Sequence, residues 1–179
     1  YITFLQQSKV IKVKEIVFIK NGKVIPDPSL VKINQLMTKS NESNKEGDTK
    51  AAIKYCSKVI ELDSTYAAAY FSRGTIKLNE FQFDEAIADF DKALKFEPLM
   101  EFALANRAFA RIRKYQFASS RTLSQNSDVT VLASKDKVPI PEAEQEKICN
   151  DLQMAVFLGD KAKMITEALS DYCQTKSSP

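Results

Sequence analysis

The side chains that could carry out chemistry are few, and the most versatile type is missing. The 179-residue sequence contains no histidine, which excludes nucleophiles activated by imidazole and metal sites built on histidine. Its four glycines are scattered along the chain, so they form no glycine-rich loop for a phosphate. The three cysteines lack the paired spacing of a zinc site. We therefore expect no enzyme, no cofactor and no metal.

Acidic pairs are the remaining candidates for acid–base catalysis. Asp84 and Glu85 are expected at the start of a helix, and Asp89 and Asp91 on the surface of that helix. Carboxylates at such places are usually solvated or interact with the positive end of the helix dipole. A catalytic pair is therefore not expected, and function has to reside in a surface.

Composition narrows the kind of surface. The net charge is only +3, and the one tight basic cluster, Arg111–Lys114, lacks the interleaved aromatics of a nucleic-acid site. We expect it to be solvated helix surface and expect no nucleic-acid partner. The sequence contains no run of about 18 apolar residues, the length that a membrane-spanning helix needs. The chain begins at Tyr1 rather than Met, which is compatible with a removed leader or a preceding domain.

The most regular stretch, from Tyr70 to Pro98, predicts two amphipathic helices joined by a short turn. Ala86, Phe90 and Ala93 recur at spacings of four and three, which places them on one helical face. Gly74 lies inside the first helix, where glycine costs about 1 kcal/mol relative to alanine. We expect it to mark a helix–helix contact too close for a Cβ. Pro98 is expected in the first turn of the next helix.

This order of residues resembles the tetratricopeptide repeat, a helical hairpin of about 34 residues. The residues that carry the resemblance are Tyr70, Gly74, Ala86, Phe90, Ala93 and Pro98. One period upstream, Ser40, Ala52, Cys56, Val59 and Ser64 occupy the matching positions. Downstream, Leu104 and Ala108 match, then the register breaks and resumes with Asp151, Leu152 and Ala155.

The resemblance implies an all-α fold, a right-handed solenoid of three helical hairpins over residues 27–179. Repeats are expected at about 33–66, 67–100 and 101–160, followed by a capping helix at 161–175. An insertion at about 116–147 makes the third repeat about 28 residues longer than the family period. It contains a β-branched run, Val129–Leu132, and is either functional or a flexible loop.

Residues 1–26 stand outside the repeats and predict a β-hairpin. Val and Ile are frequent there, and Asn21-Gly22 suits a tight turn between strands at about Lys9–Lys20 and Lys23–Ile25. A two-stranded hairpin is marginal alone, so we favour packing on the repeats. Pairing with another copy, giving a homodimer with a structural or assembly role, is the alternative.

The family binds proteins or peptides in a groove lined by the first helix of each hairpin, and the resemblance implies the same non-catalytic role here. The positions that match the groove are Met37, Asn41, Phe71, Thr75, Leu78, Phe102, Phe109, Ile112 and Arg113. The groove is either open to a partner or filled by the protein's own N-terminal hairpin or Val129–Leu132.

One subclass of the family holds the terminal carboxylate of heat-shock chaperone tails with Lys, Asn and Arg side chains. The matching positions here are Met37, Asn41, Ser72, Phe102 and Asn106. Only Asn41 fits, so we expect no such clamp.

The state of the cysteines depends on the cellular compartment in which the protein resides. Cys56 is expected to be a small buried residue. Cys149 and Cys173 frame the last helical hairpin in a way that is similar to exported bacterial members of the family. That similarity implies a disulfide in an exported or periplasmic protein, and two reduced thiols in a cytoplasmic one are equally compatible with the sequence.

Overall fold

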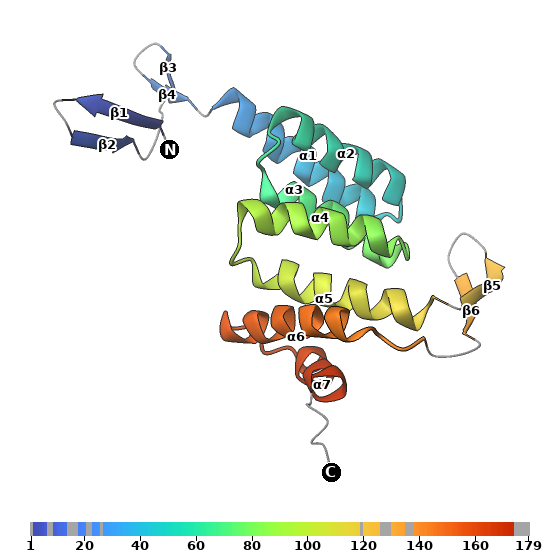
Figure 1. Cartoon of the computed structure of the whole chain (residues 1–179). Helices are drawn as coiled ribbons and strands as arrows, with labels where there is room; N and C mark the ends of the chain where they lie inside the picture. Colours follow the sequence, from blue (N-terminus) through green and yellow to red (C-terminus); the bar gives the residue numbers. More distant parts are fainter. Residues whose placement is uncertain are drawn as a thin grey trace.

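The computed structural model describes residues 27–118 and 138–173 with their side chains, together with the backbone of six short strands outside these ranges. Within that part the chain forms seven helices (Figure 1): α1 (Pro28–Lys45), α2 (Thr49–Leu62), α3 (Ala67–Asn79), α4 (Phe83–Phe96), α5 (Glu101–Gln116), α6 (Glu142–Phe157) and α7 (Lys163–Tyr172). The pairs α1–α2, α3–α4 and α5–α6 stack one on another, with α7 against α6. The predicted all-α solenoid is confirmed.

Helix ends follow from local capping. The Asp27 carboxylate accepts a hydrogen bond from the Ser29 N–H at 2.8 Å, and Pro28 opens α1. The Asp48 carboxylate accepts one from the Ala51 N–H at 2.9 Å at the start of α2. Both side chains satisfy backbone donors that have no partner within the helix. These two caps set the first residues of α1 and α2.

The position of Pro98 was interpreted wrongly. Pro98 lies in the turn before α5, which begins at Glu101 because the Met100 carbonyl accepts the first helical hydrogen bonds, from Ala103 and Leu104. After the insertion, Pro141 is the N-cap of α6. Residues 142–147, which we assigned to the insertion, are consequently the first residues of α6.

The contact between α3 and α4 explains the glycine. A Cβ built on Gly74 would lie 2.9 Å from Cε1 of Phe90, closer than real Cβ atoms approach other atoms. Ala86, Phe90 and Ala93 are each 0% exposed, as their shared face predicts. The close approach inferred from Gly74 is confirmed.

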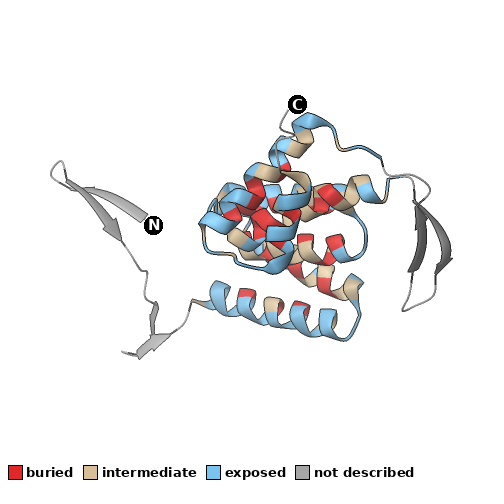
Figure 2. Cartoon of the chain, turned by 90° about the horizontal axis from the view of Figure 1, so that it is seen from below, coloured by how far each residue is buried: buried red, intermediate tan, exposed pale blue. Residues whose placement is uncertain are grey.

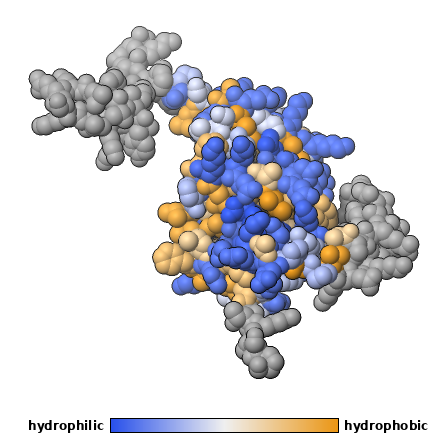
Figure 3. All heavy atoms as spheres, in the orientation of Figure 1, coloured by the Kyte–Doolittle hydropathy of each residue, from blue (hydrophilic) through white to orange (hydrophobic). Residues whose placement is uncertain are grey.

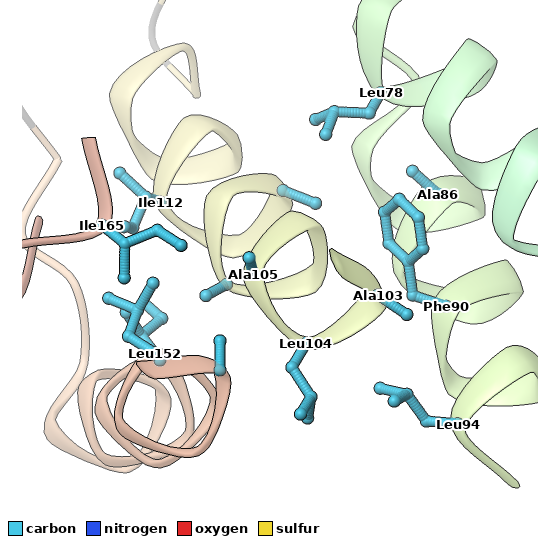
Figure 4. Close-up of a cluster of buried hydrophobic side chains, with 14 of the residues drawn as sticks. Leu78, Ala86, Phe90, Leu94, Ala103, Leu104, Ala105, Ile112, Leu152 and Ile165 are labelled. Carbon is cyan, nitrogen blue, oxygen red and sulfur yellow. The ribbon is translucent and has the colours of Figure 1, made fainter. Parts of the chain in front are cut away.

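The core has two parts. The larger runs from α3 to α7 and includes Phe90, Leu104, Ile112, Leu152 and Ile165 (Figure 4). The smaller joins α1 to α2 and α3 through Ile33, Leu36, Val59 and Ala69. Buried residues lie where helices face one another, whereas much of α1 is exposed (Figure 2).

The strands pair in three separate antiparallel sheets of two strands each. β1 (Ile2–Gln6) pairs with β2 (Lys9–Val13), and β3 (Phe18–Lys20) pairs with β4 (Lys23–Ile25). One strand over Lys9–Lys20 was expected, but its two ends pair with different partners. β5 (Ser120–Gln125) and β6 (Thr130–Ser134) pair within the insertion. The Asn21-Gly22 turn lies outside the described residues, as do the side chains of all six strands.

Candidate binding surface on the A helices

We call the first helix of each pair, α1, α3 and α5, an A helix, and the second, α2, α4 and α6, a B helix. The predicted groove residues all lie on the A helices. Their exposure separates those that can meet a partner from those that hold the helices together.

Four apolar side chains of the predicted set are accessible. Phe102 at the start of α5 is 57% exposed. Met37 on α1, Phe71 on α3 and Phe109 on α5 are half-buried, each packed against the core while presenting part of its surface to solvent. The Phe71 ring is backed by Phe90, with 6.2 Å between ring centroids. Aromatic groups fixed in this way lose little entropy on binding, which suits them as anchors.

Two of the predicted groove residues are in the core instead. Leu78 and Ile112 are 6% and 3% exposed. Ile112 lies beside Ile165 of α7 (Figure 4), and both belong to the larger core cluster. For Ile112 the spacing along one helix did not reveal this burial, because α7 approaches from outside the three hairpins. We remove both residues from the site.

Polar groups connect adjacent A helices. The Asn106 amide of α5 donates a hydrogen bond of 3.2 Å to the Thr75 hydroxyl of α3, and that hydroxyl donates to the Phe71 carbonyl at 2.9 Å. Asn41 is exposed, and Arg113 is half-buried. Asn106 was absent from the predicted groove set, although it lies at one of the positions considered for a carboxylate clamp.

We define the A-helix face by the accessible members of the predicted groove set together with Asn106. It comprises Met37, Asn41, Phe71, Thr75, Phe102, Asn106, Phe109 and Arg113. Arg113 is its one charged residue, and the other polar groups are amides and a hydroxyl.

A buried charge arrangement lies behind this face. Asp89 of α4 is only 4% exposed and accepts hydrogen bonds from Arg73, at 2.7 and 2.9 Å, and from Lys77 at 2.7 Å. Its assignment as a solvated surface residue was therefore wrong. The paired charges compensate one another, because an unpaired carboxylate at this depth would be strongly destabilising.

The arrangement is repeated in the third hairpin. Asp151 of α6 is 5% exposed and accepts hydrogen bonds from Arg107, at 2.6 and 2.9 Å, and from Arg111 at 2.6 Å. Arg111 therefore does not belong to a solvated basic cluster. Asp151 is where the repeat register resumes in the sequence, at the position that corresponds to Asp89, and the shared geometry agrees with that alignment.

Each arginine also reaches the B helix of the preceding hairpin. Arg73 donates to the Ser57 hydroxyl of α2 at 3.0 Å, and Arg107 to the Asp91 carboxylate of α4 at 2.6 Å. The hydrogen bond and charge of Asp89 raise the pKa of Arg73. We call this linkage, in which an arginine of one helix contacts two others, an arginine bridge. It fixes the spacing of successive hairpins and hence of the A-helix face.

The end of the solenoid is closed by a disulfide. Cys149 of α6 and Cys173, the C-cap of α7, are joined with their Cα atoms 5.5 Å apart. Gln145 donates to the Tyr172 carbonyl, and Gln116 donates to the Tyr172 hydroxyl at 2.8 Å. These contacts attach the last turn of α7 to α5 and α6.

No other chemistry is evident in the described ranges. Across residues 27–118 and 138–173 no three metal-binding side chains gather into a potential site. Within the same ranges, none of the helices combines the length and hydropathy needed to cross a membrane.

Stacked helical hairpins with an accessible row of side chains on their first helices define an α-solenoid interaction module. The family model for the tetratricopeptide repeat matches residues 36–66 and 67–98, and the chain contains repeats of this family. It is 42% identical over 62 residues to human tetratricopeptide repeat protein 6, covering 35% of this chain and 12% of that protein. It is 30% identical over 98 residues to the tetratricopeptide repeat and J domain-containing co-chaperone DNJ1 of Cryptococcus neoformans, covering 55% and 19%. The chain thus spans less than a fifth of either relative.

Solved structures share the fold. The Arabidopsis OM64 TPR domain aligns with a TM-score of 0.61 at 17% identity, covering 80% of this chain and 96% of that domain. The first TPR of Spaghetti (RPAP3), bound to the HSP90 peptide SRMEEVD, aligns with a TM-score of 0.61 at 19% identity, covering 83% and 95%. At these identities the likeness establishes the fold alone.

Proposed function

We propose that this protein binds an extended segment of a partner protein on the A-helix face, without catalysis. The observation that carries the proposal is the row formed by Phe71, Phe102 and Phe109 on successive A helices. Phe102 is more than half exposed, and the other two are held by the core behind them. Exposed aromatic groups on a rigid support are typical anchors of protein–protein interfaces.

The chemistry of the face indicates the kind of segment. Asn41 and Asn106 carry amides, which both donate and accept hydrogen bonds and so can pair with the peptide backbone. Arg113 could pair with one acidic residue of the partner. A segment with spaced apolar side chains and few charges fits this face best. Occupation by the chain's own N-terminal hairpin or by Val129–Leu132 stays an alternative, since those side chains lie outside the described residues.

The face differs from what a chaperone tail would need. The second TPR domain of human RPAP3 was solved in complex with the HSP70 peptide SGPTIEEVD, and both that peptide and SRMEEVD end in acidic residues. In this chain Met37 and Phe102 occupy positions where a cation would meet the terminal carboxylate. We expect fluorescence anisotropy to detect no binding of labelled SRMEEVD to the full chain. Met37→Lys with Phe102→Lys should introduce measurable binding. Tight binding of SRMEEVD by the wild type would show that the A-helix face does accept an acidic chaperone tail, contrary to our proposal.

The test of the site compares partner capture by matched variants. Phe102→Ala truncates an anchor on the A-helix face, and Met154→Ala truncates a side chain of similar exposure, 43%, on the B helix α6. Both exposed truncations should leave the fold intact, which circular dichroism checks. Proteins recovered from the native source by the wild type and by Met154→Ala, identified by mass spectrometry, should be lost with Phe102→Ala. Equal recovery by all three proteins would show that the face is not the binding site.

A further inference from the structure

A second apolar surface lies where each B helix passes into the next helix. The α2–α3, α4–α5 and α6–α7 turns lie along the same side of the solenoid, at left in Figure 1. Side chains in or beside these turns pack against one core cluster, including Ile60 near the end of α2, Met100 and Leu158. The turns therefore form a continuous edge.

This edge exposes large apolar side chains at every turn. Leu62 is 54% exposed, Leu99 68%, Phe157 83% and Met164 53%. Figure 3 shows apolar residues gathered along this side of the helical stack. Single exposed apolar residues are ordinary, but a row of them marks an interaction surface. We call this row, with the charged residues beside it, the turn edge.

The charges along the turn edge change sign from one end to the other. The α2–α3 turn carries two carboxylates, Glu61 and Asp63. The α6–α7 turn carries two lysines, Lys161 and Lys163, against one carboxylate, Asp160, and Lys163 also pairs with Glu167 of α7 at 3.4 Å. Glu61 and Lys161 are both exposed. The middle turn carries both signs, with Lys95 and Glu97 exposed beside Leu99.

This polarity makes the edge complementary to itself in the antiparallel direction. In a twofold-symmetric dimer, each contact between two different residues occurs twice. An axis at Leu99 would place Glu61 of each copy against Lys161 of the other, and Leu62 against Phe157. Lys95 would face Glu97 across the axis. A parallel arrangement would instead bring like charges together, at a cost.

We propose that the turn edge is the interface of a homodimer in which two copies pair antiparallel about the α4–α5 turn. A standard interface takes about 20–30 residues from each partner, and three turns with their flanking helix ends are of that size. The A-helix face lies on other residues. A monomer that still binds its partner would therefore contradict this proposal alone.

Charge exchange tests the pairing. Sedimentation velocity on the full chain, over about 1–100 µM, a range chosen for ordinary dimer affinities, should show a species of twice the 20.2 kDa chain mass. Glu61→Lys or Lys161→Glu creates two like-charge contacts per dimer and should weaken association at least about tenfold. The double variant Glu61→Lys/Lys161→Glu exchanges the signs and should restore it. Glu80→Lys, on the opposite side of the solenoid, is the control and should change nothing.

A second variant tests the apolar part. Leu99→Ser at the proposed axis removes an exposed side chain that the fold does not require, so it should abolish the dimer while leaving the helical content unchanged. A wild-type chain that is monomeric over the whole range, a double variant that stays dissociated, or a dimer unaffected by Leu99→Ser would each overturn the proposal.

Discussion

Replacing Gly74 with alanine adds one methyl group at a tight contact between α3 and α4. The new Cβ would lie 2.9 Å from Cε1 and 3.1 Å from Cδ1 of Phe90, and 3.2 Å from Cβ of Asp89. Phe90 is fully buried, and Asp89 is held by two cations. Neither neighbour can move away without disturbing the core or the arginine bridge.

The magnitude follows from two opposing terms. Alanine is favoured over glycine inside a helix by about 1 kcal/mol. Overpacking a well-filled contact costs about 1–3 kcal/mol. We expect the clash to outweigh the propensity, with a net loss of up to about 2 kcal/mol in the free energy of unfolding. A loss of about 2 kcal/mol corresponds to roughly 4–8 °C in Tm for a chain of this size.

The third repeat supplies a compensating change. Ala108 and Leu152 occupy the positions that correspond to Gly74 and Phe90, and both are 0% exposed. Gly74→Ala combined with Phe90→Leu therefore copies a pair that already packs in this protein. The double variant should be more stable than the sum of the single effects by at least about 1 kcal/mol.

Urea unfolding followed by circular dichroism at 222 nm measures all four proteins of this cycle. An unchanged m value would show that stability, rather than compactness of the unfolded chain, has changed. If Gly74→Ala is as stable as the wild type or more stable, the close contact is not the reason for the glycine. Strictly additive effects would refute the coupling between the two positions.

Three further predictions concern the bridges and the thiols. Arg107→Ala leaves the buried Asp151 with Arg111 alone and should cost about 2–3 kcal/mol in urea unfolding. Cys149→Ser with Cys173→Ser removes a disulfide across 24 residues, and chain entropy predicts a loss of about 3.5 kcal/mol in the free energy of unfolding. A thiol count on the unreduced, unfolded wild type should give one free thiol, and three would contradict the disulfide. Burial raises the pKa of the Cys56 thiol, so less thiolate is present at pH 8 than for a free cysteine, and iodoacetamide should label the native protein much more slowly than the unfolded one.

The hairpins could be predicted because helical periodicity is a local property. Ala86, Phe90 and Ala93 share a face in any helix, and Gly74 inside a helix requires a close neighbour. The caps at Asp27 and Asp48 are equally local, since each side chain bonds to a backbone group two or three residues away.

The buried charges could not be predicted in the same way. Whether Asp89 faces solvent or Arg73 depends on which side of α4 meets α3. The repetition of the pattern is also concealed, because the insertion separates Asp151 from Asp89 by far more than one period. In the sequence, the repetition of the buried charges was indicated only by the alignment of Asp151 with Asp89 together with the spacing of Arg73 and Arg107.

The error at Ile112 has a different cause. Its position within α5 matches the groove of the family, and its exposure is decided by α7, which places Ile165 against it. We had treated α7 only as a cap, but it covers Ile112 and so makes this position part of the core. The insertion was similarly undervalued, since Thr130, Val131 and Leu132 of its β-branched run pair with a preceding strand. The sequence of that strand, Ser120–Gln125, is largely polar.

The first hairpin lacks the devices that hold the other two, and this predicts uneven stability along the solenoid. Lys39 and Tyr55 stand where an arginine bridge would need an arginine and an aspartate, and α1 buries only Ile33, Leu36 and Ser40. Solenoid stability is nearly a sum over repeats and their interfaces, so α1 should open before α3. Hydrogen exchange should show faster exchange in α1 than in α3, and equal protection would contradict the account. Met37 and Asn41 then belong to the least stable part of the A-helix face, so a partner that contacts them should slow exchange in α1 more than elsewhere.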